Sequence, residues 1–127
     1  MERKEIAQRY SQAFKPLDAI RIPNVKPDRE SAWHLYVITL NPEALTIDRN
    51  RFINELKQRG IGSSVHFIPL HRHPFYRNTF GYNAADFPVS EWLYERIISL
   101  PVYPGMTDGD VDFVIESVTD VCRKFKR

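Results

Sequence analysis

Apolar residues recur at helical spacing in the first part of the chain and again in its middle. Residues 2–17 and 48–59 each place their apolar side chains on one side of a helix. Pro16 marks the expected end of the first helix, whereas Asp48 is placed to cap the start of the second. Gly60 supplies the left-handed backbone conformation that commonly ends a helix. We therefore predict two amphipathic helices in these stretches.

The C-terminal stretch carries the clearest helical signal. Thr107 and Asp110 form a predicted capping box, and Met106 with Val111 forms a hydrophobic staple across the helix start. The following apolar side chains repeat at helical spacing: Val111, Val114, Ile115, Val118, Val121, Cys122 and Phe125. This stripe predicts a long helix that packs against the rest of the domain.

The strongest strand candidate is residues 32–40, AWHLYVITL, because aromatic and β-branched residues dominate both alternating faces. A strand that is apolar on both faces is expected to be covered on both sides. A second short strand is predicted at 63–67, and a helix begins at Pro88 before an extended piece, ISLPVYP. This order of elements predicts the α/β (α+β) class, as a small sandwich of helices packed against a sheet.

Two stretches follow neither the helical nor the strand period. Residues 18–31 are rich in proline and predict an extended connector. Residues 68–87 combine two prolines with five aromatic side chains. A segment of this length without a period is usually functional or disordered, and its aromatic content argues against disorder. We therefore expect residues 68–87 to serve a function.

Composition describes an ordinary single domain. The 127 residues are 43% hydrophobic and 27% charged, and the net charge of +2 is spread along the chain except for a short basic cluster at 123–127. Neither a signal peptide nor a membrane anchor is recognisable, so we expect a cytoplasmic protein that binds neither nucleic acid nor membrane. The single cysteine, Cys122, cannot form an intrachain disulfide and is predicted to be a buried, inert thiol.

Three of the four histidines lie in VHFIPLHRHP, residues 65–74, which suggests a metal site, a catalytic loop or a rigid aromatic turn. The spacing of His66, His71 and His73 matches no compact pair of metal ligands, and no acidic residue is close in sequence to act as a base. A surface loop whose histidines cap turns is the simplest reading of the residues alone. Motifs for a nucleophile or a phosphate-binding loop are also missing, so we assign no catalytic, cofactor-binding or metal residue to this chain.

Three motifs in order identify a resemblance: WHLY in the strand, GIxxxVHFxPLH, and SLPxYPxMTD before the last helix. Together they resemble the C-terminal region of the DegT/DnrJ/EryC1/StrS family of PLP-dependent nucleotide-sugar aminotransferases. The resemblance covers essentially residues 1–127, and residues 1–17 are similar to the helix that links the family's large and small domains. It implies the small domain of a fold type I transferase, with a short, mainly antiparallel sheet flanked by helices over residues 32–127.

The resemblance also implies where the chemistry lies. His66, Phe67, His71 and Tyr76 are expected to approach the sugar nucleotide from the small domain. The Schiff-base lysine and the groups that hold pyridoxal phosphate belong to a large domain that would precede residue 1, and none of the six lysines here matches that motif. Cofactor and nucleotide sugar are therefore expected to bind the complete enzyme, and this chain is expected to be inactive alone.

The family acts on nucleotide-linked keto sugars in the biosynthesis of cell-surface polysaccharides or antibiotic sugars, and the resemblance implies such a role here. The alternative is a free-standing, non-catalytic module that binds a sugar nucleotide or a protein. Because a small domain without its large domain leaves an apolar face uncovered, we expect self-association through the first helix, the aromatic segment or both.

Overall fold

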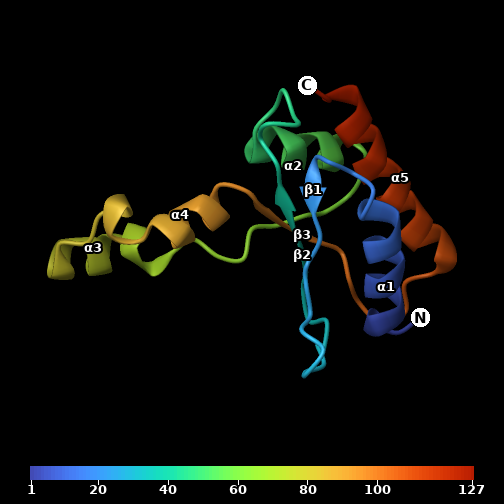
Figure 1. Ribbon diagram of the computed structural model, residues 1–127, viewed down its shortest axis with the longest axis horizontal. Helices are drawn as coiled ribbons and strands as arrows, with labels where there is room; N and C mark the ends of the chain where they lie inside the picture. Colours follow the sequence, from blue (N-terminus) through green and yellow to red (C-terminus); the bar gives the residue numbers. More distant parts are fainter.

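The computed structural model describes residues 1–127 and contains one three-stranded antiparallel sheet. The strands lie in the order β1 (Ile20–Arg21), β2 (Tyr36–Leu40) and β3 (Ile97–Leu100). Helices α1 (Arg3–Phe14) and α5 (Asp108–Lys124) lie side by side on one side of the sheet (Figure 1), and α2 (Arg49–Gln58) packs against α5 and β3. The predicted class, a short antiparallel sheet flanked by helices, is confirmed.

A separate projection extends away from the sheet between β2 and β3 in the sequence (Figure 1). Its helical elements are η1 (Leu70–Arg72), α3 (Pro74–Phe80), η2 (Ala84–Asp86) and α4 (Pro88–Tyr94). We call residues 67–95 the arm. None of the helices in the chain has the length and apolar character needed to span a bilayer.

The strand register decides which side chains share a face. Ile38 pairs with Ile98 and Tyr36 with Leu100, and all four are at most 3% exposed beneath the helices. Val37 points to the opposite face and is only half-buried. The prediction that this strand is covered on both sides is therefore wrong for this chain, because the helices cover one face and leave the other open.

Helix α1 belongs to the core. Ile6, Tyr10 and Phe14 are fully buried, and the Tyr10 ring packs 5.6 Å from the Phe14 ring and 5.1 Å from the Tyr36 ring. The Tyr10 hydroxyl donates a hydrogen bond of 2.9 Å to the carbonyl of Pro101, and burial raises its pKa. The prediction that this helix offers a free apolar surface for self-association is wrong, because its apolar side chains are buried in the chain's own core.

Local signals set the ends of α2 as predicted. The Asp48 carboxylate accepts a hydrogen bond of 2.8 Å from the backbone N–H of Arg51. Gly60 takes the left-handed conformation with φ of 81°, and the N–H of Ile61 bonds back to the carbonyl of Leu56 at 3.0 Å. This is the Schellman arrangement, in which glycine avoids the strain that a Cβ atom would cause.

The predictions for α5 are also confirmed in most respects. Thr107 and Asp110 form a capping box with reciprocal bonds of 3.1 Å and 2.8 Å, and Met106 and Val111 are buried next to it. Most of the apolar stripe is buried: Val111, Val114, Val118, Val121 and Cys122. Burial raises the pKa of the Cys122 thiol to about 12, as expected for an inert cysteine. Ile115 is only half-buried at the edge of the stripe.

A buried carboxylate joins α2 to α5. Glu55 is 1% exposed and accepts hydrogen bonds from Arg51, Arg59 and Lys124 at 2.9, 3.1 and 3.2 Å. The bond from Arg59 lowers the pKa of the Glu55 carboxyl, so the carboxylate stays ionised although it is covered. Lys124 lies on α5, so this contact links the two helices in addition to their apolar packing.

The sequence prediction differed from the structure where elements are very short. The stretch 18–31 contributes β1, which has two residues and pairs with Leu40 and Thr39. The strand predicted at 63–67 is reduced to one bridge between Ser64 and Ser99. Helix α3 lies within the segment that showed no period. A strand of two residues exists only through its pairing partner and leaves no pattern of its own in the sequence.

Two isoleucine substitutions test which side of the core is essential. Ile38→Ala should reduce the free energy of unfolding by about 2–5 kcal/mol, because Ile38 is fully buried at the centre of β2. Ile115→Ala removes the same atoms from a half-buried site and should cost clearly less. Urea denaturation followed by circular dichroism measures both. Equal losses would show that the α5 stripe is centred on Ile115 and that the face assignment is incorrect.

Candidate functional site

The site begins on the open face of the sheet, where His66 is attached to β3. Ser64 exchanges backbone hydrogen bonds with Ser99, with N···O distances of 2.7 Å and 3.2 Å. Two residues later, Nδ1 of His66 lies 2.9 Å from Oγ of Ser99. Ser99 itself pairs with Val37 and faces away from the helices. The segment leading into the arm is therefore fixed to the strand by both backbone and side chain.

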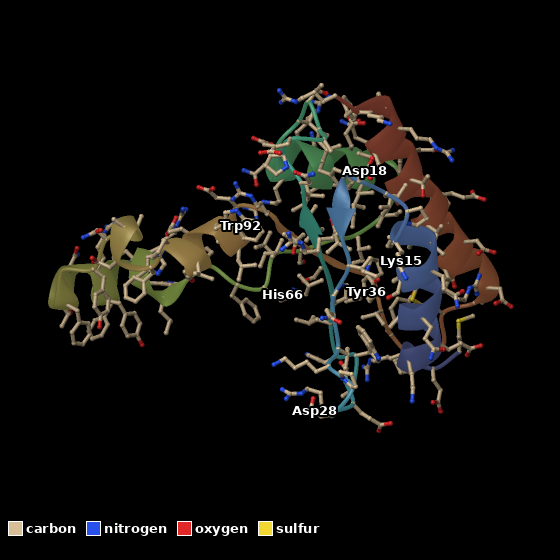
Figure 2. All side chains as sticks on the ribbon, in the orientation of Figure 1. Lys15, Asp18, Asp28, Tyr36, His66 and Trp92 are labelled. Atoms are coloured by element: carbon tan, nitrogen blue, oxygen red, sulfur yellow. The ribbon has the colours of Figure 1, made fainter.

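The outer part of this segment is accessible. Phe67 is 75% exposed, and its ring meets the His66 ring edge to face at 4.7 Å. The peptide bond between His66 and Phe67 is cis. His66 is half-buried, and Nδ1 makes the only hydrogen bond of its ring, so Nε2 has no partner within the chain. An imidazole nitrogen and an aromatic ring are thus available to a ligand or to another domain. Figure 2 shows His66 and Trp92 on the side of the sheet from which the arm projects, with Tyr36 toward α1.

The arm exposes an unusual amount of apolar surface. Nine of the eleven exposed large hydrophobic residues of the chain belong to it: Phe67, Ile68, Leu70, Phe75, Phe80, Tyr82, Val89, Trp92 and Leu93. Only His71 is buried within the arm. Exposed apolar side chains concentrated in one segment commonly mark a contact with another protein part or a ligand. The arm therefore has the character of an interface rather than of a self-sufficient domain.

A row of rings connects the parts of the arm. Tyr76 of α3 lies 5.2 Å from Phe75 and 6.3 Å from Phe80, and Phe80 stacks on Tyr82 at 5.4 Å. Tyr82 in turn meets Phe87 at 5.1 Å. The row orders the aromatic side chains even though most of them remain exposed, and Tyr76, one of the predicted residues, lies within it and is half-buried.

His71 is held by a carboxylate from another part of the arm. Its ring stacks on Phe87 at 4.7 Å, and its Nε2 lies 2.5 Å from Oε1 of Glu91 on α4. The guanidinium of Arg72 donates to both oxygens of the same carboxylate, with a distance of 2.8 Å from Nε. The hydrogen bonds from Arg72 and then from His71 lower the pKa of Glu91 to about 2. One ionised carboxylate therefore holds η1 against α4.

Arginines attach the base of the arm to the body of the domain. Arg49 at the start of α2 donates a hydrogen bond of 2.9 Å to the carbonyl of Tyr94, and its guanidinium lies 5.1 Å from the Tyr94 ring centre. At Trp92 of α4, the guanidiniums of Arg21 and Arg96 lie 5.7 Å and 4.8 Å from the ring centre. Cation–π contacts of this type add to packing where rings are partly exposed.

The structure does not bring the predicted residues to one point. His66 contacts β3, His71 contacts α4, Tyr76 lies in α3, and His73 is an exposed residue at the start of that helix. No group of three or more His, Cys, Asp or Glu side chains is arranged to hold a metal ion. The statement that no acidic residue lies near the histidines is wrong in space, because Glu91 reaches His71 across twenty residues of sequence.

Sequence reasoning overlooked Ser99, Glu91 and Arg49. Ser99 interrupts an otherwise apolar run in IISLP, and Glu91 is the first acidic residue of α4. These were the available signals, but their partners are distant in the sequence. Arg49 gives no signal, because its position next to a helix start suggests only a solvated side chain.

Solved structures similar to this chain include sugar aminotransferases. The PLP form of Spr1654 from Streptococcus pneumoniae is 33% identical, with a TM-score of 0.85 over 96% of this chain and 31% of its own. An aminotransferase involved in pseudoaminic acid biosynthesis, PseC of Helicobacter pylori, is 26% identical, with a TM-score of 0.84 over 97% of this chain and 32% of its own.

The sequence comparisons give the family. The model of the DegT/DnrJ/EryC1/StrS aminotransferase family matches residues 1–119, and this chain belongs to that family. Protein MJ1066 of Methanocaldococcus jannaschii, itself uncharacterized, is 53% identical over 94% of this chain and 31% of its own length. The spore coat polysaccharide biosynthesis protein SpsC of Bacillus subtilis is 47% identical over 95% and 31%. The chain thus spans about a third of the length of these curated relatives.

The contact between Glu91 and Arg72 makes the arm sensitive to acid. The pKa of Glu91 is lowered from 4.5 to about 2 in the folded chain. The contribution of its ionised carboxylate to the free energy of unfolding is therefore complete above pH 4.5. That contribution is lost as the pH falls toward the lower value. Carbon-13 NMR of the Glu91 carboxyl should therefore give a titration midpoint near 2.

Arg72→Met should raise this midpoint, because Arg72 supplies the largest stabilising effect on the carboxylate. Arg77→Met changes another exposed arginine of the arm and should leave the midpoint in place. A Glu91 midpoint that does not respond to Arg72→Met would show that the pair is not formed in solution.

Proposed function

We propose that this chain is the C-terminal small domain of a PLP-dependent aminotransferase that acts on nucleotide-linked keto sugars. The complete enzyme would serve the biosynthesis of cell-surface polysaccharides or antibiotic sugars. Membership of the family supports the reaction class. The roles of SpsC in spore coat polysaccharide biosynthesis and of PseC in pseudoaminic acid biosynthesis support the sugar substrate. The chain's length, about a third of its curated relatives, supports the assignment to one domain.

The observation that carries the proposal is the one-sided character of the molecule. The helices bury one face of the sheet, whereas His66, Phe67 and the apolar side chains of the arm remain accessible on the other side. A pocket between two domains needs such an incomplete wall on each of them. We assign the open face and the arm to the substrate side of that pocket.

The four predicted residues take two different parts in this proposal. His66 and Phe67 are accessible and would meet the sugar nucleotide directly, through a ring nitrogen and an apolar ring. His71 and Tyr76 are occupied by contacts within the arm, so they would act by holding it in shape. A rigid, preformed wall lowers the conformational cost of binding substrate.

The residues of this chain do not fit pyridoxal phosphate. A Schiff-base lysine is activated by burial or by a neighbouring cation, whereas all six lysines here are exposed: Lys4, Lys15, Lys26, Lys57, Lys124 and Lys126. Lys4 and Lys124 are drawn toward Glu30 and Glu55. We therefore propose that the cofactor and the catalytic lysine belong to the part of the relatives' length that this chain does not span. The chain would be inactive alone.

An exchange of domains tests the proposal. In SpsC, the matching third is replaced by this chain, and amino transfer from a panel of amino acids to a panel of nucleotide-linked keto sugars is measured. We expect transfer by the chimera and none by the 127-residue chain alone. His66→Ala should lower kcat/KM roughly tenfold, because one substrate hydrogen bond contributes up to about 1.5 kcal/mol and about 1.4 kcal/mol corresponds to a factor of ten.

His34→Ala provides the matched control, since His34 is exposed near the start of β2, has no partner in the chain and should leave the rate unchanged. A folded chimera that binds PLP but transfers no amino group would contradict the assignment as an aminotransferase domain. Amino transfer that is equal in the His66→Ala and His34→Ala chimeras would contradict the placement of His66 on the substrate side. Binding of a sugar nucleotide by the chain alone would favour a free-standing module.

A further inference from the structure

Ser99 makes contacts that its place in the sheet does not require. It is 5% exposed and lies on the open face of β3. Its backbone N–H and carbonyl both bond to Ser64, while its Oγ lies 2.9 Å from Nδ1 of His66. Ser99 therefore holds the backbone of Ser64, where the segment leading into the arm begins, and also the ring of His66, two positions after Ser64.

The hydrogen bond from Ser99 has only one good direction. The hydroxyl proton must be donated to an acceptor, because a buried, unpaired O–H costs free energy. The only side-chain or backbone partner of Oγ is Nδ1 of His66, and the residue opposite on β2, Val37, offers no polar side-chain atom. Nδ1 therefore accepts, and neutral imidazole then carries its single proton on Nε2.

We propose that Ser99 is a positioning residue that fixes His66 as an Nε2–H donor on the open face of the sheet. The second part of the proposal rests on the proposed function. In it, the Nε2–H of His66 donates to an oxygen acceptor of the substrate, such as a sugar hydroxyl, a carbonyl or a phosphoryl oxygen. The site would then discriminate against ligands that place a hydrogen-bond donor opposite Nε2–H of His66. Two donors that face each other leave both groups without an acceptor.

His71 shows the contrast within the same segment. Its Nε2 faces a carboxylate, Glu91, and its ring is buried against Phe87, so it has no nitrogen to spare for a ligand on that side. His66 has a hydroxyl as its only hydrogen-bond partner, and the other nitrogen of its half-buried ring makes no hydrogen bond within the chain. The two histidines are therefore differentiated by their partners: one is a structural contact of the arm, and the other is a presented donor.

Nitrogen-15 NMR of the His66 ring in the 127-residue chain tests the first part directly. At a pH where the ring is neutral, we expect Nδ1 to show the shift of an unprotonated acceptor and Nε2 that of a protonated nitrogen. In Ser99→Ala, both nitrogens should move toward the averaged shifts of exchanging tautomers. Ser99→Thr keeps the hydroxyl and should retain the fixed pattern.

Ser117→Ala is the control for loss of a buried serine hydroxyl, because Ser117 is 4% exposed on α5 and should leave the His66 ring unchanged. A proton on Nδ1 in the unaltered chain would overturn the proposal. Ring shifts that are identical in the unaltered chain and in Ser99→Ala would overturn it as well, provided that the amide spectrum shows both to be folded.

The domain exchange separates this inference from the function on which its second part depends. If Ser99 acts through His66, the double variant Ser99→Ala/His66→Ala should be no slower than His66→Ala alone in the chimera, although Ser99→Ala by itself should lose roughly fivefold in kcat/KM. Additive losses would overturn the coupling. A chimera in which neither variant changes the rate, while the NMR pattern depends on Ser99, would contradict the functional role of His66 and leave the positioning contact established.

Discussion

The helices of this domain cover one face of a three-stranded sheet, and the remaining features depend on that asymmetry. Tyr36 and Ile38 are buried beneath α1, α2 and α5, whereas Val37 and Ser99 lie on the opposite face of the sheet. Antiparallel sheets commonly pack one face on the core and leave the other open, so the second face is free to take part in a site. The attachment of His66 to Ser99 places the first residues of the arm over this open face.

Polar contacts shape the arm where apolar burial is lacking. Its side chains form few buried contacts of their own, so Glu91 with His71 and Arg72 fixes its internal geometry, and Arg49 fixes its base. Charge-assisted hydrogen bonds of this kind are directional and hold an exposed element in one geometry without closing its apolar surface. The apolar side chains thus remain available, which suits a segment that completes an interface with another domain.

The sequence predicted those elements whose stability is encoded locally. The capping box of α5, the Asp48 cap and the Gly60 turn of α2 need only neighbouring residues, and the structure has all three. The short strand β1 and the contact of Glu91 with His71 depend on partners that are distant in the sequence, so no local pattern predicted them. Residues 68–87 of the arm gave no period because most of their apolar side chains are not buried within this chain. The family motifs gave His66 and Phe67 as candidates, while the pairing of strands was needed to find the contact of Ser99 with His66.

The central claim is that the arm and the open face of the sheet form a surface completed by the larger domain of an aminotransferase. Hydrogen–deuterium exchange of this chain, alone and with the remaining part of SpsC added, tests it most directly. The account predicts that slower exchange on addition is confined to residues 64–95 and the adjoining strand β3. Unchanged exchange in the arm, together with new protection on the outer surfaces of α1 or α5, would contradict it.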